Sequence, residues 1–167
     1  TWNTVATVGS ITSYSDTSVS EATAYLYRVT AHNPTGFSAV SATQPATTLP
    51  AAPTTLTATD ISAGEIDLAW TDNSAGETGY KVQRSTDGGE TWTTFTTAAD
   101  ATSFHDTSVS GGTTYLYQVL ATDAGGDSAA SNSDSALTIP DQITGLNATC
   151  NSPTEIDFTW TPVAGAV

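Results

Sequence analysis

The chain has 167 residues, of which 17 are acidic and only three are lysine or arginine, and its formal net charge is −14. Nucleic acids and anionic membrane surfaces are bound by clustered basic side chains, so this composition excludes both as partners. No apolar run reaches the roughly 20 residues of a membrane-spanning helix, so membrane insertion is not expected.

The chain repeats itself without gaps at a spacing of 90 residues. Four runs recur at this spacing: Thr-Trp at 1 and 91, Asp-Thr-Ser-Val-Ser at 16 and 106, Tyr-Leu-Tyr at 25 and 115, and Glu-Ile-Asp at 65 and 155. Pro50 and Pro140 mark the two seams. A period of this size fits one small β-sandwich, so three parts are predicted: the C-terminal part of a module (1–50), a complete module (51–140), and the N-terminal part of a following module (141–167).

Alternation of apolar and polar residues predicts strands along the complete module, and no stretch has helical periodicity. Ile66, Leu68 and Trp70, for example, share one strand face. The turn run Asp87-Gly88-Gly89 separates two of the strands. The expected strands are residues 55–59, 65–71, 79–85, 91–97, 102–105, 114–122 and 128–137.

Several residues of this module resemble positions of the fibronectin type III domain. They are Pro53 and Leu56 on the first strand, Trp70 at the end of the second, the Gly-Thr-Thr-Tyr corner that ends at Tyr115, and Tyr-x-Val-x-Ala at 117–121. The resemblance implies an all-β fold of tandem fibronectin type III-like (immunoglobulin-like) seven-stranded β-sandwiches. It also implies a tyrosine corner at Tyr115 and, one period earlier, at Tyr25. Trp70, Trp92 and Trp160 are expected to be structural aromatic residues.

No residue pattern supports catalysis, so the chain is not expected to be an enzyme. His32 and His105 have no second histidine or cysteine at ligand spacing. Residues 85–92 match the Asp-box hairpin of sialidases, where the motif is a structural turn with a tryptophan packed behind it. We therefore interpret Trp92 as a packing residue and not as a sign of sialidase activity.

Acidic loops are the only candidates for a cofactor, which would be Ca²⁺. This ion takes six to eight oxygen ligands, and Asp72 with Glu77, or Asp123 with Asp127, would supply carboxylates. The alternative is a solvated acidic surface without a metal.

Two further positions are candidates for covalent chemistry. Asn147-Ala148-Thr149 is an N-glycosylation sequon. Cys150 is the only cysteine, so it is either a free thiol or a link to another chain.

Repetition of one module favours a structural protein outside the cell or on its surface, such as a fibre, stalk or surface layer. The expected partners are adjacent modules of the same chain or other copies of it, with cell-surface or matrix glycans as further candidates. Residues 141–167 of one copy would complete residues 1–50 of the next, or both would be parts of one continuous polymer. The alternative is a spacer or binding module of a larger secreted hydrolase or adhesin.

Overall fold

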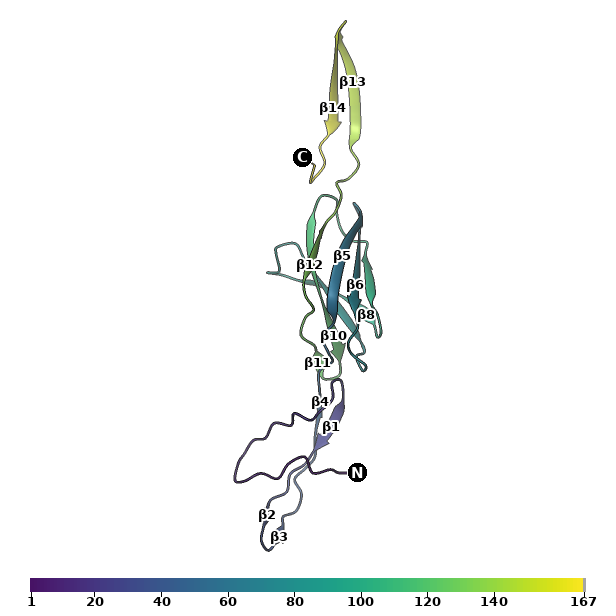
Figure 1. Cartoon of the computed structure of the whole chain (residues 1–167). Helices are drawn as coiled ribbons and strands as arrows, with labels where there is room; N and C mark the ends of the chain where they lie inside the picture. Colours follow the sequence, from purple (N-terminus) through teal and green to yellow (C-terminus); the bar gives the residue numbers. More distant parts are fainter. Residues whose placement is uncertain (167) are drawn as a thin grey trace.

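A computed structural model describes residues 1–166, and every regular element in that range is a β-strand. The three expected parts follow one another along an elongated molecule (Figure 1). No helix in the described range is long and apolar enough to cross a lipid bilayer.

The middle part is a β-sandwich in which all strand pairs are antiparallel. One sheet has the order β5 (Thr54–Ser62), β6 (Glu65–Thr71) and β9 (Ser103–Asp106). The other contains β11 (Gly126–Asp127), β10 (Thr114–Asp123), β7 (Gly79–Ser85) and β8 (Thr93–Ala98) in that order, and β12 (Asp134–Leu137) also pairs with β10. Both β10 and β7 are inner strands of this second sheet, because β7 pairs with β8 and β10, and β10 also pairs with β11 and β12.

Alternate residues of both sheets fill the space between them. Ile66 and Leu68 from β6 are 0% and 1% exposed, and Tyr117 and Val119 from β10 are both 0% exposed. Such burial of apolar surface is the main force that holds two sheets together. The buried apolar residues form one core that lies wholly within the middle module: Leu56, Ile66, Leu68, Trp70, Tyr80, Val82, Val109, Tyr115, Tyr117, Val119, Ala121 and Ala136.

The flanking parts reproduce pieces of this sandwich in the same register. In residues 1–50, β1 (Ala24–Tyr27) pairs with β4 (Gln44–Thr47), and β2 (His32–Asn33) pairs with β3 (Gly36–Phe37). At the other end, β13 (Thr144–Ser152) pairs with β14 (Glu155–Thr161), with irregularities at the same places as in β5 and β6. The backbone follows the repeat too, because Ala22 (φ 46°) has the left-handed conformation of its counterpart Gly112 (φ 63°).

Neither flanking part closes a core of its own. Val29 is 73% exposed, whereas its counterpart Val119 is fully buried. Leu146 is 68% exposed, whereas its counterpart Leu56 is 2% exposed. The sheet faces that meet inside the middle module are therefore open in residues 1–50 and 141–166.

One strand boundary differs substantially from the prediction. The expected continuous strand at 128–137 is wrong, because only β11 and β12 are regular and residues 128–133 lie between them. Ser128 and Ser131 replace the regular ladder here. Ser128 donates its amide to the Ala121 carbonyl (2.8 Å), and its hydroxyl oxygen accepts the Ala121 amide (3.0 Å). Ser131 does the same with Val119.

Candidate functional site at the seam

The end of the middle module that carries β11 faces the end of residues 1–50 that carries β1 and β4 (Figure 1). On the module side lie the loop at 72–78, which joins β6 to β7, and the turn between β10 and β11. On the other side lie residues 20–23 and 47–51. We call this contact the first seam.

Glu21 connects the two sides of the first seam. One carboxylate oxygen, Oε2, accepts the Ser74 hydroxyl (2.7 Å) and the Ala51 amide (3.1 Å). The other, Oε1, accepts the Ala75 amide (3.0 Å). Hydrogen bonds from Ala75 and Ser74 hold the pKa of Glu21 below its ordinary value, because they stabilise the charged carboxylate. Glu21 is therefore ionised at neutral pH and is held by donors from both sides of the seam.

Small residues let the two backbones approach each other closely. A Cβ placed on Gly125 would lie 2.7 Å from the Thr47 carbonyl oxygen. A Cβ on Gly76 would lie 2.8 Å from the Ala22 Cβ. Atoms never approach a real Cβ this closely, so any larger residue at 125 would push the seam apart.

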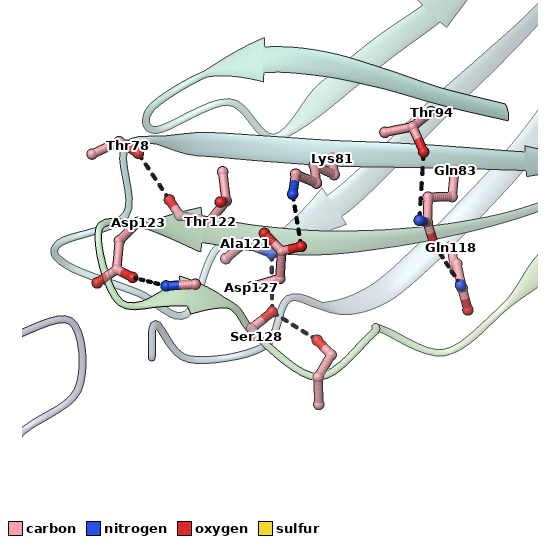
Figure 2. A network of polar contacts seen from close by, with 12 residues as sticks. Thr78, Lys81, Gln83, Thr94, Gln118, Ala121, Thr122, Asp123, Asp127 and Ser128 are labelled. Carbon is pink, nitrogen blue, oxygen red and sulfur yellow. Dashed lines mark hydrogen bonds and ion pairs between the residues drawn. The ribbon is translucent and has the colours of Figure 1, made fainter. Parts of the chain in front are cut away.

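A polar network braces the module side of the first seam (Figure 2). The Asp123 carboxylate accepts the Gly125 amide (2.8 Å), which fixes the turn. Asp127 accepts the Lys81 ammonium (2.7 Å). Hydrogen bonds and charge from Lys81 lower the pKa of Asp127. Neither of these two predicted calcium ligands belongs to a group of three or more candidate ligands in the described range.

The other predicted pair lies in a larger cluster of oxygen atoms. The carboxylates of Asp72 and Glu77 lie within 4.8 Å of each other and of a third one, from Asp100. Asp72 follows β6, Glu77 precedes β7, and Asp100 lies between β8 and β9. Glu77 also accepts the Asp100 amide (2.9 Å). Asp72 and Glu77 lie on the same loop as Ser74 and Ala75, so the group adjoins the first seam.

The comparisons with known proteins bear on the middle module. Residues 56–131 match the family model described as "PBP1-like, fibronectin3-like domain". The middle module is a fibronectin type III-like domain. The expected all-β sandwich class is confirmed, since the strands of the middle module form two facing antiparallel sheets.

Three solved structures are similar to parts of the chain, and the first of them supports the fibronectin type III-like fold. The crystal structure of chicken CNTN1 FN1-FN3 domains is 20% identical, with a TM-score of 0.51, and the match covers 75% of this chain and 46% of that one. A Fn3-like protein from Clostridium thermocellum is 35% identical, with a TM-score of 0.47 over 56% of this chain and 96% of that one. A beta-1,2-glucanase from Parabacteroides distasonis is 26% identical, with a TM-score of 0.49 over 56% of this chain and 13% of that one. No curated protein matches the chain.

The predicted structural aromatic residues occupy distinct places in the fibronectin type III-like fold. The Tyr115 hydroxyl oxygen accepts the Ser110 amide (2.9 Å), and Tyr25 accepts the Ser20 amide (2.8 Å) in the same way. Trp70 packs against Tyr80 with ring centroids 5.5 Å apart. Trp160, the counterpart of Trp70, is 55% exposed on β14.

The Asp-box turn joins β7 to β8 of the domain. The Asp87 carboxylate accepts the Ser85 hydroxyl (2.6 Å) and the Thr91 amide (3.0 Å). Hydrogen bonds from Ser85 and Thr91 lower the pKa of Asp87. The Trp92 ring lies 3.3 Å from the position that a Cβ on Gly89 would take. These contacts order the hairpin, and they start β8 at Thr93 where the sequence pattern predicted residue 91.

The candidates for covalent chemistry lie outside the complete domain. Asn147 is an exposed residue of β13, and its amide donates to the Thr149 hydroxyl at 3.4 Å. Cys150 is an exposed free thiol on the same strand.

His32 stacks on Phe37 in the β2–β3 hairpin, with ring centroids 5.7 Å apart.

Sequence reasoning missed Glu21 and Asp100. Glu21 has Gly111 as its counterpart, and Asp100 has Ser10. A search for residues that recur at the 90-residue spacing therefore overlooks both. They could have been found by searching for acidic residues that differ from their counterparts and lie next to a seam or a turn.

Proposed function

We propose that this chain is a structural segment of an extended assembly outside the cell, in which fibronectin type III-like modules are held in a fixed relative orientation by their seams. The observation that carries the proposal is the set of three hydrogen bonds that Glu21 accepts at the first seam. A charge-assisted hydrogen bond is stronger than a neutral one, and two of these three, from Ser74 and Ala75, cross the seam. Fibronectin type III-like domains are generally non-catalytic, and we propose no reaction for this one.

The open faces of the flanking parts support an array of modules. Each exposes residues whose counterparts are buried, such as Val29 against Val119. Strands that cover these faces would bury their apolar surface, and each Å² removed from water stabilises the assembly by about 25 cal/mol. In this proposal, neighbouring strands of the same chain supply the cover. Completion by a second copy, in which residues 141–167 cover residues 1–50 of the next, is the alternative, and it would leave the place of the inner strand β7 unfilled.

At the second seam, which lies at Pro140, the acidic and the small residue occupy opposite positions from those at the first seam. Gly111 stands where the first seam has Glu21, and Asp141 stands where it has Ala51. A Cβ on Gly111 would lie 2.8 Å from the Asp141 carboxylate oxygen. The acidic side chain therefore fills the same space from the opposite side of the seam. This exchange supports a joint that is kept closed although its residues differ.

The test uses an extended chain in which residues 51–90 precede Thr1, because the repeat makes this join gapless. That chain has two complete modules and keeps all 167 original residues. Residual dipolar couplings should fit one alignment tensor for both modules. The Glu21→Ala variant should need two tensors, and Glu155→Ala, which removes the same charge from an exposed position on β14, should still fit one. Two independent tensors in the unaltered extended chain would refute a fixed seam.

The length of the parent protein distinguishes a fibre from a spacer. Many further modules of the same period would support the fibre or surface layer. A catalytic domain joined to a few modules would instead support the alternative, a spacer in a larger secreted hydrolase.

A further inference from the structure

Three carboxylates converge beside the first seam, two from the loop between β6 and β7 and one from the turn between β8 and β9. The oxygen atoms of Asp72, Glu77 and Asp100 all lie within 4.8 Å of one another. Glu77 is only 7% exposed. Three like charges at this separation repel one another, and burial of one of them weakens the screening by water.

No basic residue of the chain compensates this charge. Lys81 pairs with Asp127 at 2.7 Å, and Arg84 pairs with Asp106 at 2.8 Å. Arg28 lies over the Trp2 ring, 4.1 Å from its centroid. These three are the only lysines and arginines in the sequence, so a positive charge at the cluster has to come from outside the chain.

A buried hydroxyl group provides a second and independent observation. Tyr80 is 1% exposed, and its hydroxyl oxygen has no hydrogen-bond partner among the described residues. Burial, then the Asp72 carboxylate, and then the charges of Glu77 and Asp100 raise the pKa of Tyr80. The charges that raise this pKa belong to the same three residues, so the buried hydroxyl lies close to the cluster. A buried polar atom without a partner costs about 1–3 kcal/mol, so this place favours a ligand that satisfies oxygen atoms.

We propose that Asp72, Glu77 and Asp100 bind one Ca²⁺ ion beside the first seam. All of the converging atoms are oxygens, with no histidine or cysteine among the three residues, and this donor set suits Ca²⁺ better than Zn²⁺. Three carboxylates from two loops also give the variable geometry that Ca²⁺ accepts and Mg²⁺ does not. Backbone carbonyls and water would supply the remaining ligands.

The ion also stabilises the loop that forms the seam. Asp72 and Glu77 flank Ser74 and Ala75, which donate to Glu21. The site belongs to the middle module, because Asp72 has Pro162 as its counterpart and Asp100 has Ser10. The inference stands apart from the proposed array, because a module can bind Ca²⁺ whether or not its seam is rigid.

The experiment titrates CaCl₂ into the full 167-residue chain after removal of metals with a chelator, using calorimetry. Tb³⁺ luminescence provides a second readout, because Trp70 lies beside Tyr80 (5.5 Å between ring centroids) and can transfer excitation to a bound ion. We expect one saturable site, with weaker binding of Mg²⁺. The Asp100→Asn variant should lose about tenfold or more in Ca²⁺ affinity, since fewer charged ligands weaken such a site. Asparagine is the suitable replacement because it tolerates the left-handed backbone of Asp100 (φ 58°).

The matched control is Asp67→Asn. Asp67 belongs to the other acidic group of the module, with Glu65 and His105, on the exposed face of β6 and β9. The Ca²⁺ affinity of the Asp67→Asn variant should equal that of the unaltered chain. Equal losses in both variants, or no saturable binding in the unaltered chain, would overturn the proposal.

Thermal melting separates a metal site from a merely structural role. In chelator, Asp100→Asn should melt higher than the unaltered chain, because it removes repulsion between carboxylates. With excess Ca²⁺ the order should reverse, because only the unaltered chain gains the full binding energy. A variant that melts higher in both conditions would mean that the carboxylates bind no ion, which contradicts the proposal. Asp72→Asn repeats the comparison from a separate segment.

Discussion

At the scale of single residues, Asp106 is the most highly connected side chain of the module. Its carboxylate is 1% exposed, and it accepts hydrogen bonds from Arg84 (2.8 Å), the Tyr117 hydroxyl (3.0 Å) and the Ser108 amide (3.0 Å). Arg84 in turn lies over the rings of Phe95 and Tyr115. The charge of Asp106 is thus buried but fully paired.

Replacement of Asp106 by asparagine should lower the free energy of unfolding by about 3 kcal/mol, because it leaves the Arg84 charge unpaired in a largely buried position. Chemical denaturation measures this loss, and Asp60→Asn on the exposed surface is the control. The loss should also depend on pH. Burial alone would raise the pKa of Asp106, but hydrogen bonds from Ser108, Arg84 and Tyr117 outweigh burial and lower it.

The sign of the pH effect follows from that lowered pKa. Because the folded pKa lies below that of an unfolded aspartate, about 3.9, the stabilisation is present above pH 4 and is lost as the pH falls through the folded pKa. The difference between the unaltered chain and Asp106→Asn should therefore shrink between pH 5 and the acid limit of folding. A difference that stays constant with pH would show that Asp106 acts only through packing.

Residue identities were partly predictable from the sequence. The repeated tyrosine at 25 and 115 indicated a corner, and its hydroxyl accepts a backbone amide in both parts. The partners of Asp106 were not predictable, because Arg84 and Tyr117 come from other strands and meet only in the folded sheet. The same holds for Asp100, which a turn brings toward Asp72 and Glu77.

At the scale of elements, the pattern Ser-x-x-Ser replaces a regular strand edge. Ser128 and Ser131 each satisfy both backbone groups of a buried residue on β10. Ser38 and Ser41 do the same for Ala31 and Val29 one period earlier. A hydroxyl that takes the place of a carbonyl acceptor lets the chain bend away without leaving a buried amide unpaired.

Replacement of Ser128 by alanine should destabilise the module by about 1–3 kcal/mol, because the Ala121 amide loses its acceptor in the core. Ala121 is fully buried, so water cannot take the place of the hydroxyl. Ser133→Ala, an exposed position in the same segment, is the matched control and should change stability little. Equal effects of the two substitutions would show that the Ser128 hydroxyl is not the acceptor that matters.

Strand existence was more predictable than strand ends. The ranges 65–71 and 79–85 agree with β6 and β7, because alternation there is uninterrupted. The prediction of one strand over 128–137 failed because serine hydroxyls there accept the backbone amides that a strand ladder would otherwise pair. The alternation of apolar and polar residues does not show this replacement. The start of β8 moved for a similar reason, since Asp87 holds Thr91 in the turn.

At the scale of the whole molecule, the 90-residue period accounts for the register of all three parts. The pairing of Tyr25 with Ala46 repeats that of Tyr115 with Ala136. The period does not predict how the parts meet, because seam residues such as Glu21 differ from their counterparts. The proposed function follows the same division, since it takes the array from the repetition and the stiffness of the seams from the residues that differ.

Amide hydrogen exchange tests most directly whether the flanking parts are open pieces of one recurring sandwich. In the 167-residue chain, β7 and β10 should exchange slowly, whereas β1, β4, β13 and β14 should exchange quickly, because their apolar faces are uncovered. When residues 51–90 are placed before Thr1, β1 and β4 should become as protected as β10 and β12. Protection of β1 and β4 equal to that of β10 in the original chain, or no gain in the extended one, would contradict the account.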